Sequence, residues 1–239
     1  MQRLTILGLA MLAQASQATT LLYSNGPVVD AATGLSVTAQ PTPKADYAFG
    51  MQTKSSNVVA DDFTVGAGGW TLQSIDFFAL QNNASGFTLQ TVSWSIVAGD
   101  VNNGALIAFG TTTLGNGGLV GYRVAPNTLT NTQRPIYRAG ADIPDLGLTA
   151  GHYWLRWSMT GSLSSGPWQP PTADNLAGNA MQSTAGAAFT TALTANSRSS
   201  AELPFMLYGT VSAVPEPASA GLLLGGLGLL GLRARRRRA

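Results

Sequence analysis

Hydrophobic and polar residues alternate along the middle of the chain in short runs that predict β-strands. In residues 91–98 the apolar positions are Val92, Trp94 and Ile96. In residues 152–160 the apolar positions are Tyr153, Leu155, Trp157 and Met159. A period of two residues places the apolar side chains on one face of a strand and the polar ones on the other. Both runs therefore predict strands with one face in a hydrophobic core.

Further strands are predicted between turn signals rich in glycine, asparagine and proline. They cover residues 20–24, 62–65, 70–80, 105–114, 119–124, 135–143, 187–193 and 204–213, with glycine-rich turns at 66–69 and 115–118. Many short strands without an intervening amphipathic helix are typical of an all-β protein. We expect one antiparallel, jelly-roll-like β-sandwich over residues 19–213. Its long loops, residues 25–61 and 161–184, are where binding residues are often placed.

The first 18 residues have the features of a secretory signal peptide. Arg3 gives the positive start, an apolar run of ten residues follows from Leu4 to Ala13, and small residues stand at Ser16 and Ala18. Signal peptidase reads small residues at these two positions, so we expect cleavage after Ala18, with Ala15 as the second option. The apolar run is too short to span a membrane. The chain is therefore expected to be exported.

The C-terminal region, residues 214–239, combines three adjoining parts. The triplet Pro215, Glu216 and Pro217 comes first, and an uncharged Gly/Leu-rich segment of 15 residues follows at 218–232. The last part is basic and contains Arg233, Arg235, Arg236, Arg237 and Arg238. As a helix the apolar segment would measure about 22 Å, shorter than the ~30 Å hydrocarbon core of a bilayer. We expect a short transmembrane helix whose arginines stay in the cytoplasm.

This order of parts resembles the PEP-CTERM sorting signal of Gram-negative bacteria. The resemblance implies processing by the membrane enzyme exosortase near the Pro-Glu-Pro triplet. It also implies an inner-membrane-anchored precursor and a product at the cell surface or outside the cell, often in strains that make extracellular polysaccharide. The expected partners are signal peptidase, exosortase and, before processing, the membrane.

The charge of the chain is concentrated at its ends. The net charge is +2, but the terminal arginines and Arg3 leave seven basic and ten acidic residues in 19–214. A nucleic-acid binder needs a basic face, which this domain cannot build, so no nucleic-acid partner is expected. The absence of cysteine excludes disulfides, zinc–thiolate sites and cysteine nucleophiles.

Catalytic residues are scarce in the sequence. His152 is the single histidine, and no serine has the flanking residues of a nucleophile elbow. Asp61 and Asp62 are adjacent, so on a strand they would point to opposite faces. Residues 100–104 (DVNNG) resemble the opening of a calcium loop but lack its later glutamate, and the same residue types form hairpin turns. We expect no enzyme activity, cofactor or metal, although calcium at Asp100–Gly104 is left open.

A ligand surface is suggested by His152, Trp154, Arg156 and Trp168. If the apolar face of residues 152–160 is in the core, Trp154 lies outside beside His152 and Arg156, and Trp168 lies in a Gly/Pro loop. Aromatic and polar groups together suit sugar binding. The alternative is that both faces are covered, or that Trp154 is packed beneath residues 161–184. The first hypothesis is a non-enzymatic structural or interaction protein of the surface or matrix. A carbohydrate-binding module is the alternative, and a glycan hydrolase with distant acids is the third.

Overall fold

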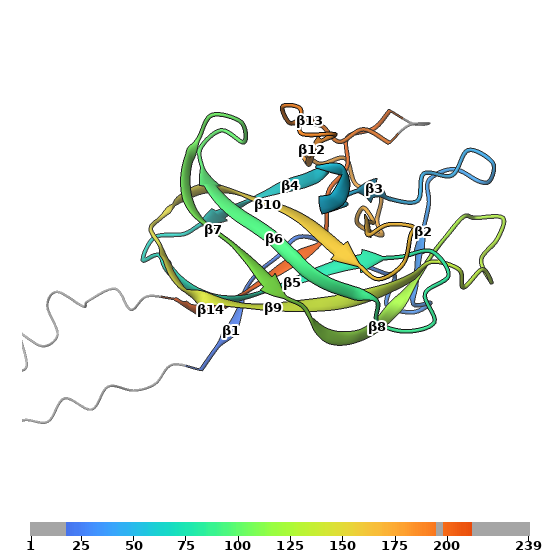
Figure 1. Cartoon of the computed structure of the whole chain (residues 1–239), viewed down its shortest axis with the longest axis horizontal. Coiled ribbons are helices and arrows are strands. Elements are labelled where there is room, and N and C mark those ends of the chain that lie inside the picture. The colour runs from blue at the N-terminus through green and yellow to red at the C-terminus, as the bar shows by residue number, and fades with distance from the viewer. Residues whose placement is uncertain (1–17, 195–197, 212–239) are drawn as a thin grey trace, which may run out of the picture.

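The computed structural model describes residues 18–194 and 198–211, which form strands in two sheets (Figure 1). The all-β prediction is confirmed, and one sheet is curled into a half-barrel. Jelly-roll connectivity stays a prediction. The predicted signal peptide and sorting region lie outside the described residues, apart from Ala18. Within the described ranges there is no helix whose length and apolar character would let it cross a membrane.

The larger sheet has eight strands, and six of them follow one another in the order β1-β14-β5-β9-β8-β2. Their bounds are β1 Thr20–Ser24, β14 Phe205–Val211, β5 Trp70–Leu80, β9 Pro135–Leu148, β8 Gly115–Val124 and β2 Leu35–Val37. The short strand β11 (Trp168–Gln169) pairs with both β5 and β3 (Phe49–Gly50). Neighbouring strands are antiparallel except β2 and β8, which are parallel.

The smaller sheet has the order β13-β12-β4-β10-β6-β7 and carries the site described below. Its strands are β13 Thr190–Thr191, β12 Met181–Ser183, β4 Val58–Val65, β10 Gly151–Gly161, β6 Leu89–Ala98 and β7 Ala105–Thr113. A single turn of 3-10 helix, η1 (Thr53–Ser55), precedes β4. In Figure 1, β6, β7 and β10 lie in one layer and β5 and β9 in the other.

The hydrophobic core lies between the two sheets. Trp157 on β10 is completely buried, and its ring packs against Phe77 and Phe205 of the opposite sheet at centroid distances of 5.7 and 5.8 Å. Its indole N–H donates to the Gln169 side chain over 3.1 Å, which satisfies the polar atom of a buried aromatic residue. The apolar faces predicted for residues 91–98 and 152–160 are both part of this core.

The structure corrects the predicted turn at residues 115–118. These residues belong to β8, and a single residue, Leu114, separates β7 in one sheet from β8 in the other. The register of β8 against β9 shifts between Asn116 and Leu119, and Gly118 has a φ of 97°. Glycine tolerates this backbone conformation, so the residues read as a turn form a bulge within a strand. The predicted loop at 25–61 likewise contains β2, β3, η1 and the start of β4.

Candidate functional site

A groove of about 410 Å³ crosses the outer face of the smaller sheet, on the side away from the core. It is lined by Val58, Ser93, Trp94, Ser95, Phe109, Gly110, Thr111, Arg156, Ser158 and Phe189. Trp94 lies on β6 and Gly110 on β7, the strands that also carry the serine, threonine and phenylalanine residues of the lining. The Trp94 side chain itself is part of the core. The groove therefore extends over β10, β6 and β7 and the start of β4, and Phe189 reaches it from the segment before β13.

Two phenylalanines line the groove, one on a strand and the other outside the strands. Phe109 lies on the edge strand β7 and is 75% exposed. Phe189 is held through its backbone by Asn102, whose side chain donates to Phe189 O (3.1 Å) and accepts from Phe189 N (2.8 Å). The paired bonds fix a residue that lies outside any strand. The sequence does not mark Phe109 or Phe189 as ligand residues, and it places Asn102 only in the turn at 100–104. Only the three-dimensional structure brings these distant segments together.

Hydroxyl groups cover the part of the sheet between the aromatic residues. Ser93 Oγ lies 3.2 Å from Thr111 Oγ1, and Ser158 Oγ accepts from Thr53 Oγ1 at 3.1 Å. Ser93 and Ser95 are half-buried, and Thr111 is exposed. A hydroxyl can donate and accept, so this surface offers both kinds of hydrogen bond to a ligand.

Of the predicted ligand residues, Arg156 lies in the groove, whereas Trp154 is covered. Trp154 is on the outer face of β10, as expected, but it is only 9% exposed. It packs with Ala60, Val97 and Val101, so a small second cluster covers it on this side of the sheet. Trp154 is therefore packed, as the alternative prediction had it. Part of its cover comes from Val101 in the β6–β7 connection, and not only from residues 161–184.

The structure places Trp168 in a different sheet from Trp154. Trp168 is on β11, paired with Gly50 and Leu80, and its indole N–H donates to Ser165 Oγ over 3.3 Å. It lines a separate cavity of about 230 Å³ together with Tyr47, Ala48, Leu80, Asn82 and Arg134. The predicted surface joining Trp154, Arg156 and Trp168 is therefore not formed.

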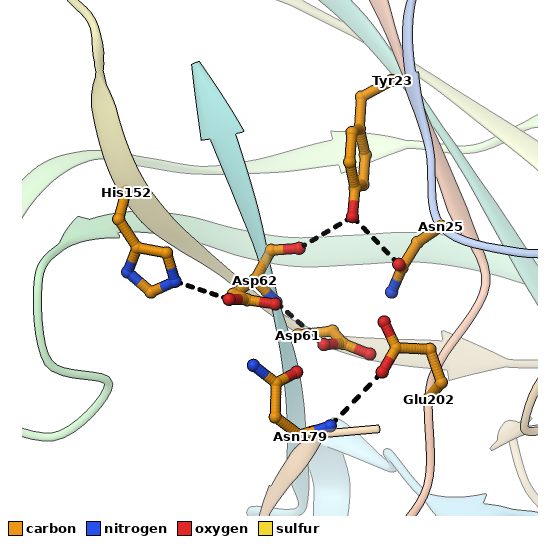
Figure 2. A network of polar contacts seen from close by, with 7 residues as sticks. All are labelled: Tyr23, Asn25, Asp61, Asp62, His152, Asn179 and Glu202. Carbon is orange, nitrogen blue, oxygen red and sulfur yellow. Dashed lines mark hydrogen bonds and ion pairs between the residues drawn. The ribbon is translucent and has the colours of Figure 1, made fainter. Parts of the chain in front are cut away.

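His152 lies further along β10 and is bound to an acidic residue. Its Nε2 is 2.5 Å from Asp62 Oδ2 (Figure 2). Its ring also meets that of Trp154 edge to face, at a centroid distance of 5.9 Å. Among the described residues no serine hydroxyl is bonded to His152, so the elements of a Ser-His-Asp triad are not assembled around it. The Asp62 carboxylate is occupied by this contact.

Asp61 points the other way, into the interior, as predicted for adjacent residues on a strand. It is completely buried and accepts from the backbone N–H of Leu203 (2.7 Å) and of Asp62 (2.9 Å). Figure 2 shows the Glu202 carboxyl beside that of Asp61. Burial and the charge of Glu202 raise the pKa of Asp61 to about 8, against the lowering effect of the two N–H donors.

Tyr23, Asn25 and Asn179 surround this acidic pair. The Tyr23 hydroxyl donates to Asn25 Oδ1 over 3.0 Å, and Asn179 N donates to Glu202 over 3.3 Å (Figure 2). Burial, followed by the charges of Asp61, Asp62 and Glu202, raises the pKa of Tyr23 to about 12. Burial also raises the pKa of Glu202. The cluster joins β4 to the segment that enters β14, and it is a partly buried polar contact around the buried Asp61 carboxyl.

The loop at Asp100–Gly104 is a hydrogen-bonded turn. Asp100 Oδ1 accepts from the backbone N–H groups of Asn102 and Asn103 at 2.9 and 2.7 Å. These bonds are typical of an aspartate that stabilises its own turn. Asn102 additionally holds Phe189, so its side chain is committed to the groove. In the described part of the chain, no group of three or more His, Cys, Asp or Glu residues could hold a metal ion.

The fold and the groove define an all-β domain with a ligand-sized concave surface on one sheet. Residues 213–238 match the family model of the PEP-CTERM protein-sorting motif. The chain thus carries this sorting motif at its C-terminus, as the sequence predicted, and the motif implies an exported protein that is processed by exosortase. A search of curated proteins finds no match to the chain.

Proposed function

We propose that this chain is a non-enzymatic protein of the cell surface or extracellular matrix, and that its β domain binds polysaccharide through the groove on the smaller sheet. The observation that carries the proposal is the strongly exposed Phe109 beside a floor of serine and threonine hydroxyls. Surface aromatic residues are common singly, but here Phe109 lines a concave site together with Phe189.

The groove matches the two-sided chemistry of a sugar. The C–H face of a pyranose ring is apolar and can pack on Phe109 or Phe189, while its hydroxyls exchange hydrogen bonds with side chains such as Ser95 and Thr111. Both aromatic rings have few rotatable bonds, so they lose little conformational entropy on binding. An open groove also accepts a segment inside a long chain, whereas a closed pocket would accept only an end.

The composition of the groove supports binding without catalysis. Its lining residues include no carboxylate and no histidine, whereas glycoside hydrolysis commonly needs two carboxyl groups across the bond that is cleaved. Asp61 is buried on the core side, and Asp62 is bound to His152. We therefore propose neither a cofactor nor a reaction for this domain.

The two terminal regions would direct the export of the domain to the outside of the cell, where polysaccharide is found. We propose that signal peptidase removes residues 1–18 and that the 218–232 segment holds the precursor in the inner membrane. Exosortase would then process the chain near Pro215, Glu216 and Pro217 and deliver the β domain to the surface or the exterior. This sequence of events leaves residues 19–213 facing polysaccharide outside the cell.

Phe109→Ala should lower the affinity for a bound polysaccharide by about tenfold or more, the loss of one well-packed aromatic contact. The measurement is affinity electrophoresis of the exported form in gels containing a panel of polysaccharides. Leu176→Ala is the matched control, since Leu176 is also strongly exposed (64%) but does not line the groove. The proposal fails if no polysaccharide retards the wild type, or if Phe109→Ala is retarded as strongly as the control.

A further inference from the structure

We propose that the groove is selective for acidic polysaccharides, because Arg156 is placed to bind the carboxylate of a uronate residue. The inference rests on the proposed function, since it names the class of polysaccharide that the same groove takes. Arg156 is the one charged residue among those that line the groove.

The register of the sheet puts Arg156 in line with the aromatic wall. Arg156 on β10 lies opposite Ser95 on β6, and Ser95 lies opposite Phe109 on β7. Adjacent strands are about 4.8 Å apart, so the backbones of Arg156 and Phe109 are roughly 10 Å apart across the groove. A pyranose ring above Phe109 and Ser95 therefore has room to direct a carboxylate, its own or that of the next sugar, toward Arg156.

The Arg156 charge is only partly compensated within the protein. Its Nη2 donates to the carbonyl oxygen of Val101, while Nε is buried without a hydrogen-bond partner. The guanidinium lies over the Phe189 ring, 5.3 Å from its centroid. In the part of the chain that the structure describes, Arg156 forms no ion pair. A guanidinium in this state gains a strong, charge-assisted hydrogen bond when a carboxylate approaches.

Asp100, whose charge acts on Arg156, is hydrogen-bonded within its own turn. Asp100 lies in the neighbouring β6–β7 connection, and its Oδ1 accepts from the backbone of Asn102 and Asn103. Burial lowers the pKa of Arg156, and the Asp100 charge opposes that change. The other lining residues are uncharged, and Ser93, Ser95, Ser158 and Thr111 among them carry hydroxyl groups. An anionic ligand thus meets a positive site that has no carboxylate in its lining.

The test compares each acidic polysaccharide with its carboxyl-reduced form, in which the uronate becomes the corresponding neutral sugar. Hyaluronan, alginate and polygalacturonate are presented to the exported protein in affinity gels or by calorimetry. We expect at least one acidic polymer to bind about tenfold or more tightly than its reduced form. Added salt should weaken the binding of the acidic form and leave that of the reduced form almost unchanged.

Variants then assign the preference to Arg156. Arg156→Gln should lower the affinity for the acidic polymer until it matches that for the reduced form, and Arg156→Lys should keep part of the preference. Arg138→Gln is the matched control, because Arg138 lies on β9 of the other sheet, where it pairs with Asp76. Thermal melting of each variant checks that the Val101 contact is not needed for folding.

The possible results separate a failure of the selectivity for acidic polymers from a failure of the proposed function. Equal binding of acidic and reduced polymers by the wild type overturns the inference and leaves the proposed function standing. A preference that survives in Arg156→Gln, or a loss of binding to both forms in that variant, overturns the role given to Arg156. Binding to no polysaccharide at all overturns the proposed function as well.

Discussion

Replacing Pro215, Glu216 and Pro217 together with alanine should abolish the processing of the chain. Proline fixes its own backbone torsion and disfavours helix in the residue before it, so we expect an extended triplet that a membrane-bound enzyme can reach. Alanine removes this restriction and favours helix, so the apolar segment could extend through the triplet. The unprocessed precursor, still carrying its arginine-rich end, should accumulate in the inner membrane.

Immunoblots of membrane and external fractions with an antibody against the β domain measure this effect. We expect the wild type as a shortened form outside the cell and the triple variant as a longer form in the membrane fraction. Pro126→Ala is a suitable control, because Pro126 is an exposed proline of the β domain far from the motif in sequence. A triple variant that is shortened and released like the wild type would contradict the role assigned to the motif.

The stability of the domain should fall as the pH rises from about 4 to about 8. An unfolded aspartate has a pKa near 3.9, whereas burial and Glu202 raise that of Asp61 to about 8 in the folded state. Between these values the folded protein keeps a proton that the unfolded chain has lost. The free energy of unfolding then decreases by up to about 1.4 kcal/mol per pH unit for this group. Glu202, whose pKa burial also raises, acts in the same direction.

Asp61→Asn removes the ionisable group. The slope of the unfolding free energy against pH should then become smaller by the equivalent of close to one bound proton. Urea unfolding at pH 5, 6.5 and 8 gives the slope for each protein. Asp145→Asn serves as the control, because Asp145 is exposed and bonded to Gln73 and should leave the slope unchanged. If the amide prevents folding, the wild-type curve still decides: stability that rises from pH 5 to pH 8 contradicts the burial argument.

The strands could be predicted from sequence because alternation is a local property. The predicted bounds of residues 20–24 and 70–80 coincide with β1 and β5, and the apolar face of residues 152–160 is the core face of β10. The turn predicted at residues 115–118 was wrong, because glycine and asparagine occur in a bulge within a strand as well as in a turn.

The groove could be predicted only in part, because it depends on which strands become neighbours. Alternation placed Arg156 on the outer face, but it could not show that Val101 would cover Trp154 from a different connection. Nor could it bring Phe189 to the groove, which requires the contact with Asn102 across 87 residues of sequence. Residue type and a position in a Gly/Pro loop suggested that Trp168 belongs with Trp154, but the pairing of β11 with β5 separates the two residues.

Chemical-shift mapping tests the central claim most directly, that the exported domain binds polysaccharide on the outer face of its smaller sheet. The exported protein, labelled with ¹⁵N, is titrated with oligosaccharides of the polymer that it binds best. We predict that the perturbed amides cluster on β6, β7 and β10 around Ser95, Phe109 and Arg156, with smaller changes near Phe189. Perturbations confined to the cavity beside Trp168, or none at saturating ligand, would contradict the account.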